Sequence, residues 1–301
     1  MSLARRVVLA ALAGSAVAGC GVSRRSPQAT GGGSAAPAQA APTAAQAPAA
    51  PPAPAPAPAA APAVPAAPTR DDLVARLGEL TPSCWALDGP GVLTALPDGE
   101  QAIALTFDAC GGPGSDGYDA ALIDTLRSHQ VPATLFLNAR WIDANPEVFQ
   151  QLAADPLFEI GNHGTRHRPL SVTGRSAYGI AGTADVGEVY DEIAGNRDGL
   201  TELLGHPPAF FRAGTAYYDD VAAQAVGLLG ERIAGFTVNG DAGATFSASQ
   251  VHRTVAAADP GSIVIAHMNH PAGGTAAGVA AALPELLDAG IRFVRLSDVR
   301  W

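Results

Sequence analysis

The chain has 301 residues, with 18 basic and 28 acidic side chains and a formal net charge of −10. Every basic residue is an arginine, and the absence of lysine excludes Schiff-base chemistry and a P-loop lysine. Residues 1–69 hold four arginines and no acid, which leaves 232 residues with a net charge of −14. A segment of that size can bury the core of one domain. Its acidity argues against binding to nucleic acid or directly to an anionic membrane surface.

The first twenty residues have the layout of a bacterial export signal. Arg5 and Arg6 precede an apolar run from Val7 to Ala18, which is too short for a confident transmembrane span. The run leads into Gly19 and Cys20, and the sequence Val-Ala-Gly-Cys resembles a lipobox, which marks its cysteine for lipidation. We therefore predict a lipoprotein signal peptide over 1–20, with Cys20 lipidated. The alternative is an ordinary secretory signal in which Cys20 is incidental.

Residues 21–69 are dominated by alanine and proline. Such a segment cannot bury enough apolar surface to offset the entropy lost on ordering, and its prolines favour extended conformations. We predict a disordered tether between the anchor and a folded domain. The protein is then expected to be exported and held at the outer face of the cytoplasmic membrane by lipid alone, with its domain in the cell-wall space.

The folded part is predicted to begin with an extension over 70–99. Asp71 and Asp72 open a short helical pattern that runs to Leu80, because acids are favourable near a helix N-terminus. The chain from Pro82 to Gly99 is predicted to be a loop.

From residue 100 to 301, short apolar runs alternate with helical patterns. Strands are predicted at 103–108, 133–137, 158–161, 209–213, 233–238, 262–267 and 293–296. Helices are predicted at 118–128, 146–154, 186–204, 218–229, 249–257 and 277–289. This alternation predicts an α/β fold, a (β/α) barrel of about seven strands.

Polar side chains occur at or just after the carboxyl ends of five predicted strands, where barrels of this class collect their catalytic groups. They are Asp108, His163, Arg212, Asp241 and His267.

His163 and His167 have the spacing of two metal ligands. If they lie on one helical turn, both imidazoles share a face and can bind one ion. No glutamate follows His163, which excludes the HExxH pattern of zinc proteases. Two surface histidines in a polar loop are the alternative, and the position after a strand favours the metal site.

The remaining strand-end residues are candidates for acid–base catalysis. Asp108 is a candidate base or ligand, with a turn or helix-cap role as the alternative. His267 is a candidate general acid, with a buried structural histidine as the alternative and His270 as a competitor. Arg212 is a candidate partner for Asp108, and Asp241 for His267.

The order of these motifs resembles one known family. Thr106-Phe107-Asp108, the His163/His167 pair, Phe211-Arg212, the Asp241 region and Ile263-x-Ile265-x-His267 follow one another as in the polysaccharide deacetylases, the NodB-homology domains of carbohydrate esterase family 4. The resemblance covers about residues 100–301. It implies a deformed (β/α) barrel and the hydrolysis of acetyl groups on a polysaccharide, with zinc or another divalent ion as cofactor.

The resemblance also implies a role for each residue. The implied roles are metal ligands (His163 and His167), general base (Asp108), general acid (His267), and residues that hold the base and the acid in place (Arg212 and Asp241, respectively).

The first motif departs from the family pattern. The family has two adjacent aspartates, of which the second binds the metal, whereas this chain has Ala109 there and reads TFDAC. The third ligand is therefore open among Asp108 itself, Asp116 or Asp119 from the following glycine-rich loop, and Cys110. The Cys110 side chain lies on the same side as Asp108 if the strand continues, because side chains alternate along a strand.

Two cysteines remain besides the one in the lipobox. In an exported domain Cys84 and Cys110 are expected to form a disulfide, which would attach the extension to the rim of the site. Free thiols are the alternative, and a disulfide would exclude Cys110 as a metal ligand.

Together these features predict a metal-dependent deacetylase of a cell-wall polysaccharide, with peptidoglycan as the expected substrate. The alternative is a catalytically impaired, glycan-binding wall protein of the same fold. Hydrolysis of a non-sugar amide is supported only by analogy of fold. The sequence leaves open the polysaccharide, the metal and the oligomeric state.

Overall fold

A computed structural model describes residues 67–301. The predicted signal peptide, its lipidation site Cys20 and the predicted tether up to position 66 lie outside the described residues. Thr69, at the end of the predicted tether, caps the first helix by accepting a hydrogen bond from the Asp72 N–H. Within 67–301, no helix combines the length and the apolar character that a membrane span requires.

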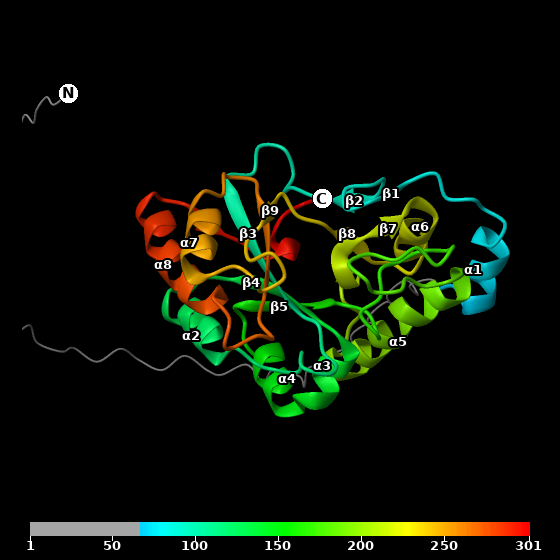
Figure 1. Ribbon diagram of the computed structural model, residues 1–301, viewed down its shortest axis with the longest axis horizontal. Coiled ribbons are helices and arrows are strands. Elements are labelled where there is room, and N and C mark those ends of the chain that lie inside the picture. The colour runs from blue at the N-terminus through cyan, green and yellow to red at the C-terminus, as the bar shows by residue number, and fades with distance from the viewer. Residues whose placement is uncertain (1–66) are drawn as a thin grey trace, which may run out of the picture. The chain divides into compact units, whose positions relative to one another are not determined.

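The domain is built around a curled parallel sheet (Figure 1). In spatial order its strands are β2 (Val92–Leu93), β8 (Arg232–Ala234), β6 (Phe210–Phe211), β5 (Phe158–Asn162), β4 (Ala133–Leu137), β3 (Ala102–Ala109), β10 (Ile263–His267) and β9 (Val238–Asn239). Each neighbouring pair is parallel, and β11 (Arg292–Phe293) also runs parallel to β3. β3 and β4 are buried along their whole length, as expected for a parallel sheet covered on both faces.

One segment of chain joins the two ends of this sheet. β8 pairs with β6 and β2 at one end, whereas β9, the next strand in the chain, pairs with β10 at the other. The backbone of 235–237 therefore connects the ends where a regular barrel would have a strand pair. The predicted deformed (β/α) barrel is confirmed, with the predicted strand 233–238 divided into β8 and β9.

Helices cover the outside of the barrel. They are α1 (Arg70–Leu77), α2 (Ala120–Ser128), α3 (Ala139–Ala144), α4 (Pro146–Ala153), α5 (Val186–Leu204), α6 (Asp220–Leu228), α7 (Ala248–Ala256) and α8 (Thr275–Asp288). α2, α7 and α8 form one group and α1, α5 and α6 another, at opposite ends of the curled sheet (Figure 1).

The alternation of side chains along β3 separates the core from the site. Leu105, Phe107 and Ala109 pack into the apolar core beneath the helices. Thr106 and Asp108, on the other face, are buried polar residues inside the barrel. A strand that is buried along its whole length thus turns its two polar side chains to the barrel interior.

The extension is an integral part of the domain. α1 ends at Leu77, before the predicted Leu80, and buries Leu73 and Leu77 against α5 and α6. The predicted loop from Pro82 to Gly99 contains two strands: β2, which forms an edge of the sheet, and β1 (Trp85–Ala86), which pairs antiparallel with β7 (Tyr218–Asp219). Strands of two residues are too short to show a period in the sequence.

Most other predicted elements are confirmed, and β4 and α5 have the predicted bounds. α3 is missing from the prediction because six residues are too few for a helical period. It begins after Asn138, whose side chain accepts a hydrogen bond from the Arg140 N–H.

The docking of α1 can be tested with neighbouring residues of this helix. Leu73→Ala should lower the free energy of unfolding by about 2–5 kcal/mol, because it removes a fully buried side chain from the core. Val74→Ala is the control, since Val74 is 40% exposed, and it should change stability by less than about 0.5 kcal/mol. Urea denaturation measures both, and two equally small effects would contradict the docking of α1.

Candidate active site

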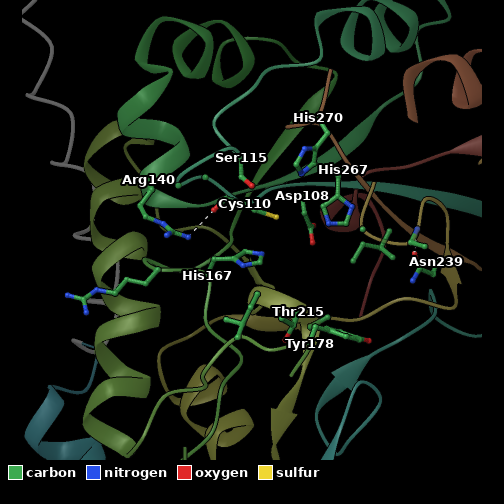
Figure 2. Close-up of a pocket in the computed structure, with 18 of the residues that line it drawn as sticks. Asp108, Cys110, Ser115, Arg140, His167, Tyr178, Thr215, Asn239, His267 and His270 are labelled. Carbon is green, nitrogen blue, oxygen red and sulfur yellow. Dashed lines mark hydrogen bonds between the residues drawn. The ribbon is translucent and has the colours of Figure 1, made fainter. Parts of the chain in front are cut away.

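Strand ends from several parts of the chain meet around one cavity of about 720 Å³ (Figure 2). Asp108 and His267 occupy paired positions on β3 and β10, so neighbouring strands deliver both side chains to this cavity. His167 follows β5 and also lines the cavity, and Arg212 directly follows β6. The structure therefore brings together the strand-end residues that the sequence singles out.

Asp108 is held by a buried ion pair. Its Oδ1 accepts a hydrogen bond of 2.8 Å from Nη1 of Arg212, and both side chains are almost completely buried. Burial by itself would raise the pKa of Asp108, but the Arg212 guanidinium, helped by His163 and His267, holds that pKa below its usual value. The carboxylate is thus charged at neutral pH and has Oδ2 left to face the site.

His163 is oriented by the backbone of Arg212. Its Nδ1 lies 2.8 Å from the Arg212 carbonyl oxygen, which can only accept, so Nδ1 carries the proton and donates it. The free Nε2 lies 3.7 Å from Oδ2 of Asp108 and 3.8 Å from Sγ of Cys110. Burial lowers the pKa of His163, but Asp108 and Cys110 outweigh it and the net shift is upward.

The two histidines share a site without a helical turn, so that part of the prediction is wrong. The segment after β5 is a loop, in which Gly164 has a φ of +74° and His167 a φ of +59°. The ring centroids of His163 and His167 are 4.9 Å apart with an interplanar angle of 80°. Backbone turning in the left-handed region replaces the helix in bringing the two imidazoles together.

Glu192 on α5 anchors this loop, and the sequence analysis missed it. Its carboxylate accepts hydrogen bonds of 3.0 Å from the Arg166 N–H and 3.1 Å from the Arg168 N–H. A Cβ on Gly164 would lie 2.5 Å from Oε1 of Glu192, so glycine is required for this close approach. The signal in the sequence is an acid within the apolar stripe of α5, next to the buried Ile193.

A second buried carboxylate, that of Asp241, positions His267. Asp241 is completely buried, and its Oδ1 lies 2.9 Å from Nδ1 of His267. Its Oδ2 accepts hydrogen bonds from the His267 N–H at 2.7 Å and from the Thr275 hydroxyl at 2.9 Å. Burial lowers the pKa of His267, but the Asp241 carboxylate and Cys110 raise it well above the usual value. His270 also lines the cavity, where its Nε2 is 3.4 Å from the Asn269 amide nitrogen.

The candidates for a third metal ligand differ in position. The ligand atoms of Cys110, His163 and His167 all lie within 4.8 Å of one another. Asp116 instead accepts a hydrogen bond of 2.6 Å from the Gly112 N–H. Asp119 caps α2, where its side chain accepts a hydrogen bond from the Leu122 N–H. Of the candidates Asp116, Asp119 and Cys110, only Cys110 clusters with the two histidines.

The predicted disulfide does not form. Cys84 and Cys110 are both free thiols. Cys84 precedes β1, where its N–H donates to Oδ1 of Asp220, whereas Cys110 points into the cavity beside the histidines (Figure 2). Cys84 directly precedes β1 and Cys110 directly follows β3, and these strands belong to different sheets. The sequence does not reveal this separation, which places the thiols at different sites.

The chemistry of this donor set fits a divalent cation. Two imidazoles face one space, and at least one has its other ring nitrogen donating to a carbonyl, as is usual for metal-bound histidine. The buried carboxylate of Asp108 and the imidazole of His267 line the same cavity but do not belong to this cluster. Two imidazoles, an ionised carboxylate and a cationic imidazole thus surround one space, which is a combination suited to metal-assisted hydrolysis.

Comparison with known proteins identifies the class. The sequence profile of the family described as polysaccharide deacetylase matches residues 95–234. A peptidoglycan-N-acetylglucosamine deacetylase of Bacillus cereus is 28% identical over 218 residues, which cover 71% of this chain and 95% of that protein. The chain is therefore similar in sequence to the polysaccharide deacetylases.

Solved structures share the fold. A crystal structure of a peptidoglycan N-acetylglucosamine deacetylase, bound to a hydroxamate-type benzamide, superposes with a TM-score of 0.57 at 23% identity and covers 69% of this chain and 92% of that one. A family 4 pseudoenzyme from Bacillus anthracis superposes with a TM-score of 0.58 at 19% identity, over 70% of this chain and 69% of that one.

A buried carboxyl group lies beneath the site and supports it. Oε2 of Glu231 accepts a hydrogen bond of 3.2 Å from Asn162, while Oε1 has no partner among the described residues. The Asn162 amide oxygen in turn accepts hydrogen bonds from the Gly164 N–H and from the Asn196 side chain, both at 2.9 Å. Burial raises the pKa of Glu231 to about 8.

This raised pKa predicts a loss of stability with rising pH. The folded protein keeps a proton on Glu231 that the unfolded chain releases near pH 4.5, so the free energy of unfolding falls as pH rises towards 8. Between pH 6 and 9 the loss should be about 2–3 kcal/mol. Glu231→Gln should flatten this dependence, and the exposed Glu202→Gln should retain it. Urea denaturation at both pH values is the measurement, and identical slopes in wild type and Glu231→Gln would contradict the assignment.

Proposed function

We propose that the chain is a metal-dependent hydrolase that removes N-acetyl groups from peptidoglycan. The observation that carries this proposal is that two imidazoles, the ionised Asp108 and the cationic His267 lie together around one cavity. Two similarities support peptidoglycan as the substrate. The sequence matches the polysaccharide deacetylase profile, and it matches a peptidoglycan-N-acetylglucosamine deacetylase over 95% of that protein's length.

His163 and His167 would hold the cation, and we propose zinc. A divalent ion bound there supplies Lewis-acid activation of water and of the acetyl carbonyl. Imidazole ligands suit zinc, and the orientation of His163 by the Arg212 carbonyl fixes which nitrogen faces the ion.

Asp108 acts as the general base. Its Oδ2 faces the cluster and can take the proton of the attacking water, while Arg212 keeps Oδ1 occupied and the carboxylate in place. Because the Arg212 charge keeps the pKa of Asp108 low, the base is ionised and ready at neutral pH.

His267 acts as the general acid. Asp241 holds its Nδ1 and stabilises the imidazolium, which leaves the Nε2 proton available to the leaving amine of the sugar. His270 lacks a carboxylate partner in the described part of the chain, so we assign the acid to His267 rather than to His270.

The N-terminal features suit this work. We propose that Cys20 is lipidated after export and that residues 21–69 tether the domain to the outer face of the cytoplasmic membrane. The lipobox-like sequence and the alanine- and proline-rich composition support this arrangement. It would place the enzyme beside the wall polymer, with the lipid as its sole membrane contact.

Acetate release tests the function. The protein should release acetate from N-acetylated peptidoglycan, lose this activity to a chelator, and regain it with zinc. Asp108→Asn and His267→Gln should each lower kcat by roughly 10²–10⁴-fold, because each removes one proton-transfer group. His129→Gln, at an exposed histidine at the end of α2, should leave kcat unchanged.

One observation favours a second candidate. Ala109 stands where the family has a metal-binding aspartate, and a pseudoenzyme is among the structures with this fold. A protein that binds peptidoglycan but releases no acetate with zinc or cobalt would be a glycan-binding wall protein. That result would overturn the hydrolase.

A further inference from the structure

The missing aspartate raises the question of what completes the metal site. The Ala109 side chain lies on the helix-facing side of β3, in the same core as Phe107, and is completely buried. The next residue points to the opposite side, into the cavity, because side chains alternate along the strand. The cavity therefore receives the side chain of Cys110.

We propose that the Cys110 thiolate is the third protein ligand, so that the metal is held by one sulfur and two imidazoles. This assignment rests on the proposed function for the presence of a metal, and it adds the identity of the ligand and the class of metal. A site of this composition leaves a fourth position open for water or substrate, as catalytic zinc sites do.

The distances agree with a tetrahedral centre. Bond lengths of about 2.3 Å to sulfur and 2.05 Å to nitrogen put these two ligand atoms about 3.5 Å apart in a tetrahedron. Sγ of Cys110 lies 3.8 Å from Nε2 of His163, and the three ligand atoms all lie within 4.8 Å of one another. The Cys110–His163 distance is thus within a few tenths of an ångström of the tetrahedral value.

The backbone fixes the thiol at this place. β3 ends at Ala109, whose carbonyl accepts a hydrogen bond from the Asn138 N–H. Gly111 follows with a φ of +67°, and a Cβ there would lie 2.5 Å from the Trp141 nitrogen. The chain must therefore turn directly after Cys110, which keeps the sulfur at the end of the strand.

The acidic candidates do not belong to the cluster of ligand atoms. Oδ1 of Asp108 is bound to the guanidinium of Arg212, whose charge opposes a cation at that carboxylate. Asp116 holds the Gly112 N–H in the following loop. A thiolate ligand leaves Asp108 free to act as the base, and sulfur favours zinc over the hard ions magnesium, calcium and manganese.

Cobalt gives a readout of the ligand that does not depend on activity. The full chain, stripped of metal by a chelator and titrated with Co²⁺, should develop the near-ultraviolet absorption band of sulfur-to-cobalt charge transfer. Cys110→Asp should bind Co²⁺ through a carboxylate and show visible d–d absorption without this band. Cys110→Ala should bind Co²⁺ at least about tenfold more weakly, because it removes a ligand.

The other two cysteines provide controls. Cys84→Ser should keep the charge-transfer band, since Cys84 does not belong to the cluster in the described part of the chain. Cys20→Ser should keep it as well if Cys110 supplies the sulfur. Co²⁺ that binds without the band, a band that survives in Cys110→Ala, or a failure of Co²⁺ to bind would each overturn the assignment.

The experiment separates the ligand from the function. Zinc-dependent acetate release by a protein whose cobalt form lacks the band would refute the thiolate and leave the deacetylase standing. The band without acetate release would support the thiolate and refute the deacetylase.

A second inference rests on a cluster of aromatic side chains, of which Tyr178 lines the cavity. Trp85 of β1 stacks on Tyr217 with ring centroids 5.5 Å apart, and Tyr178 meets the edge of Tyr217 at 5.7 Å. The Arg175 guanidinium lies 5.1 Å from the Trp85 ring centroid. Tyr178 is 75% exposed and lines the same cavity as Asp108.

We infer that these aromatic residues form a platform for a sugar ring of the same glycan, beyond the sugar that is deacetylated. Aromatic rings offer a flat apolar face together with a polar edge, which suits a pyranose with its C–H faces and hydroxyl rim. The guanidinium of Arg175 adds donors for sugar oxygens. We assign the platform to a further sugar of the bound glycan because Tyr178 lines the same cavity as Asp108. This inference therefore also rests on the proposed glycan substrate.

Substrate length tests the platform. Tyr178→Ala should raise KM for a peptidoglycan tetrasaccharide at least about fivefold more than it raises KM for a monosaccharide, because it removes an aromatic contact that only the longer substrate makes. The exposed Leu203→Ala, outside the cavity, should change neither constant. Titration of the metal-free protein with the tetrasaccharide should change its tryptophan fluorescence. Trp85→Phe should abolish this fluorescence change, and Tyr178→Ala should weaken the affinity for the tetrasaccharide. An equal effect on short and long substrates, or unchanged binding, would refute the platform.

Discussion

Arg212 is completely buried inside the barrel, and each group of its guanidinium has a partner on another strand or beyond its end. Nε and Nη2 donate to the carbonyls of Ala234 and Gly235, Nη1 donates to Thr106 and Asp108, and the planar group lies over the Phe136 ring. Removing one partner of such a buried pair costs about 3–5 kcal/mol, because the other charge is left without compensation. The Arg212 carbonyl also orients His163. One residue therefore sets the charge of the proposed base and the direction of a metal-facing imidazole.

The loop that follows β5 depends on buried polar groups rather than on regular structure. Glu192 holds its N–H groups, and the Asn138 side chain donates to the carbonyls of His163 and Gly164 at 3.0 and 2.8 Å. These bonds satisfy backbone groups that would otherwise be buried without partners. They also stabilise the left-handed conformation of His167, which costs free energy in a residue other than glycine. The geometry of the two imidazoles is therefore set by a network that lies behind them.

Two buried carboxylates with different partners divide the acid–base chemistry between them. Asp108 pairs with a permanently charged guanidinium and stays available as a base, whereas Asp241 pairs with an imidazole and keeps it protonated. Environment rather than residue type assigns these opposite roles. The Cys110 thiol lies between the two pairs, where positive groups hold its pKa well below the usual value although burial acts in the opposite direction. This charge distribution is what a thiolate ligand requires.

By itself the sequence determined the alternation of strands and helices, the class of fold, and the strand-end residues from Asp108 to His267. These follow from local periodicity and from the rule that parallel barrels gather their chemistry at one end. Only the tertiary structure decided that the histidine segment is a loop, that Glu192 and Glu231 support it, and that Cys84 and Cys110 lie apart. The physical reason is that the role of a buried acid or thiol depends on groups that are distant in the sequence. Local sequence patterns do not indicate which distant groups will contact it.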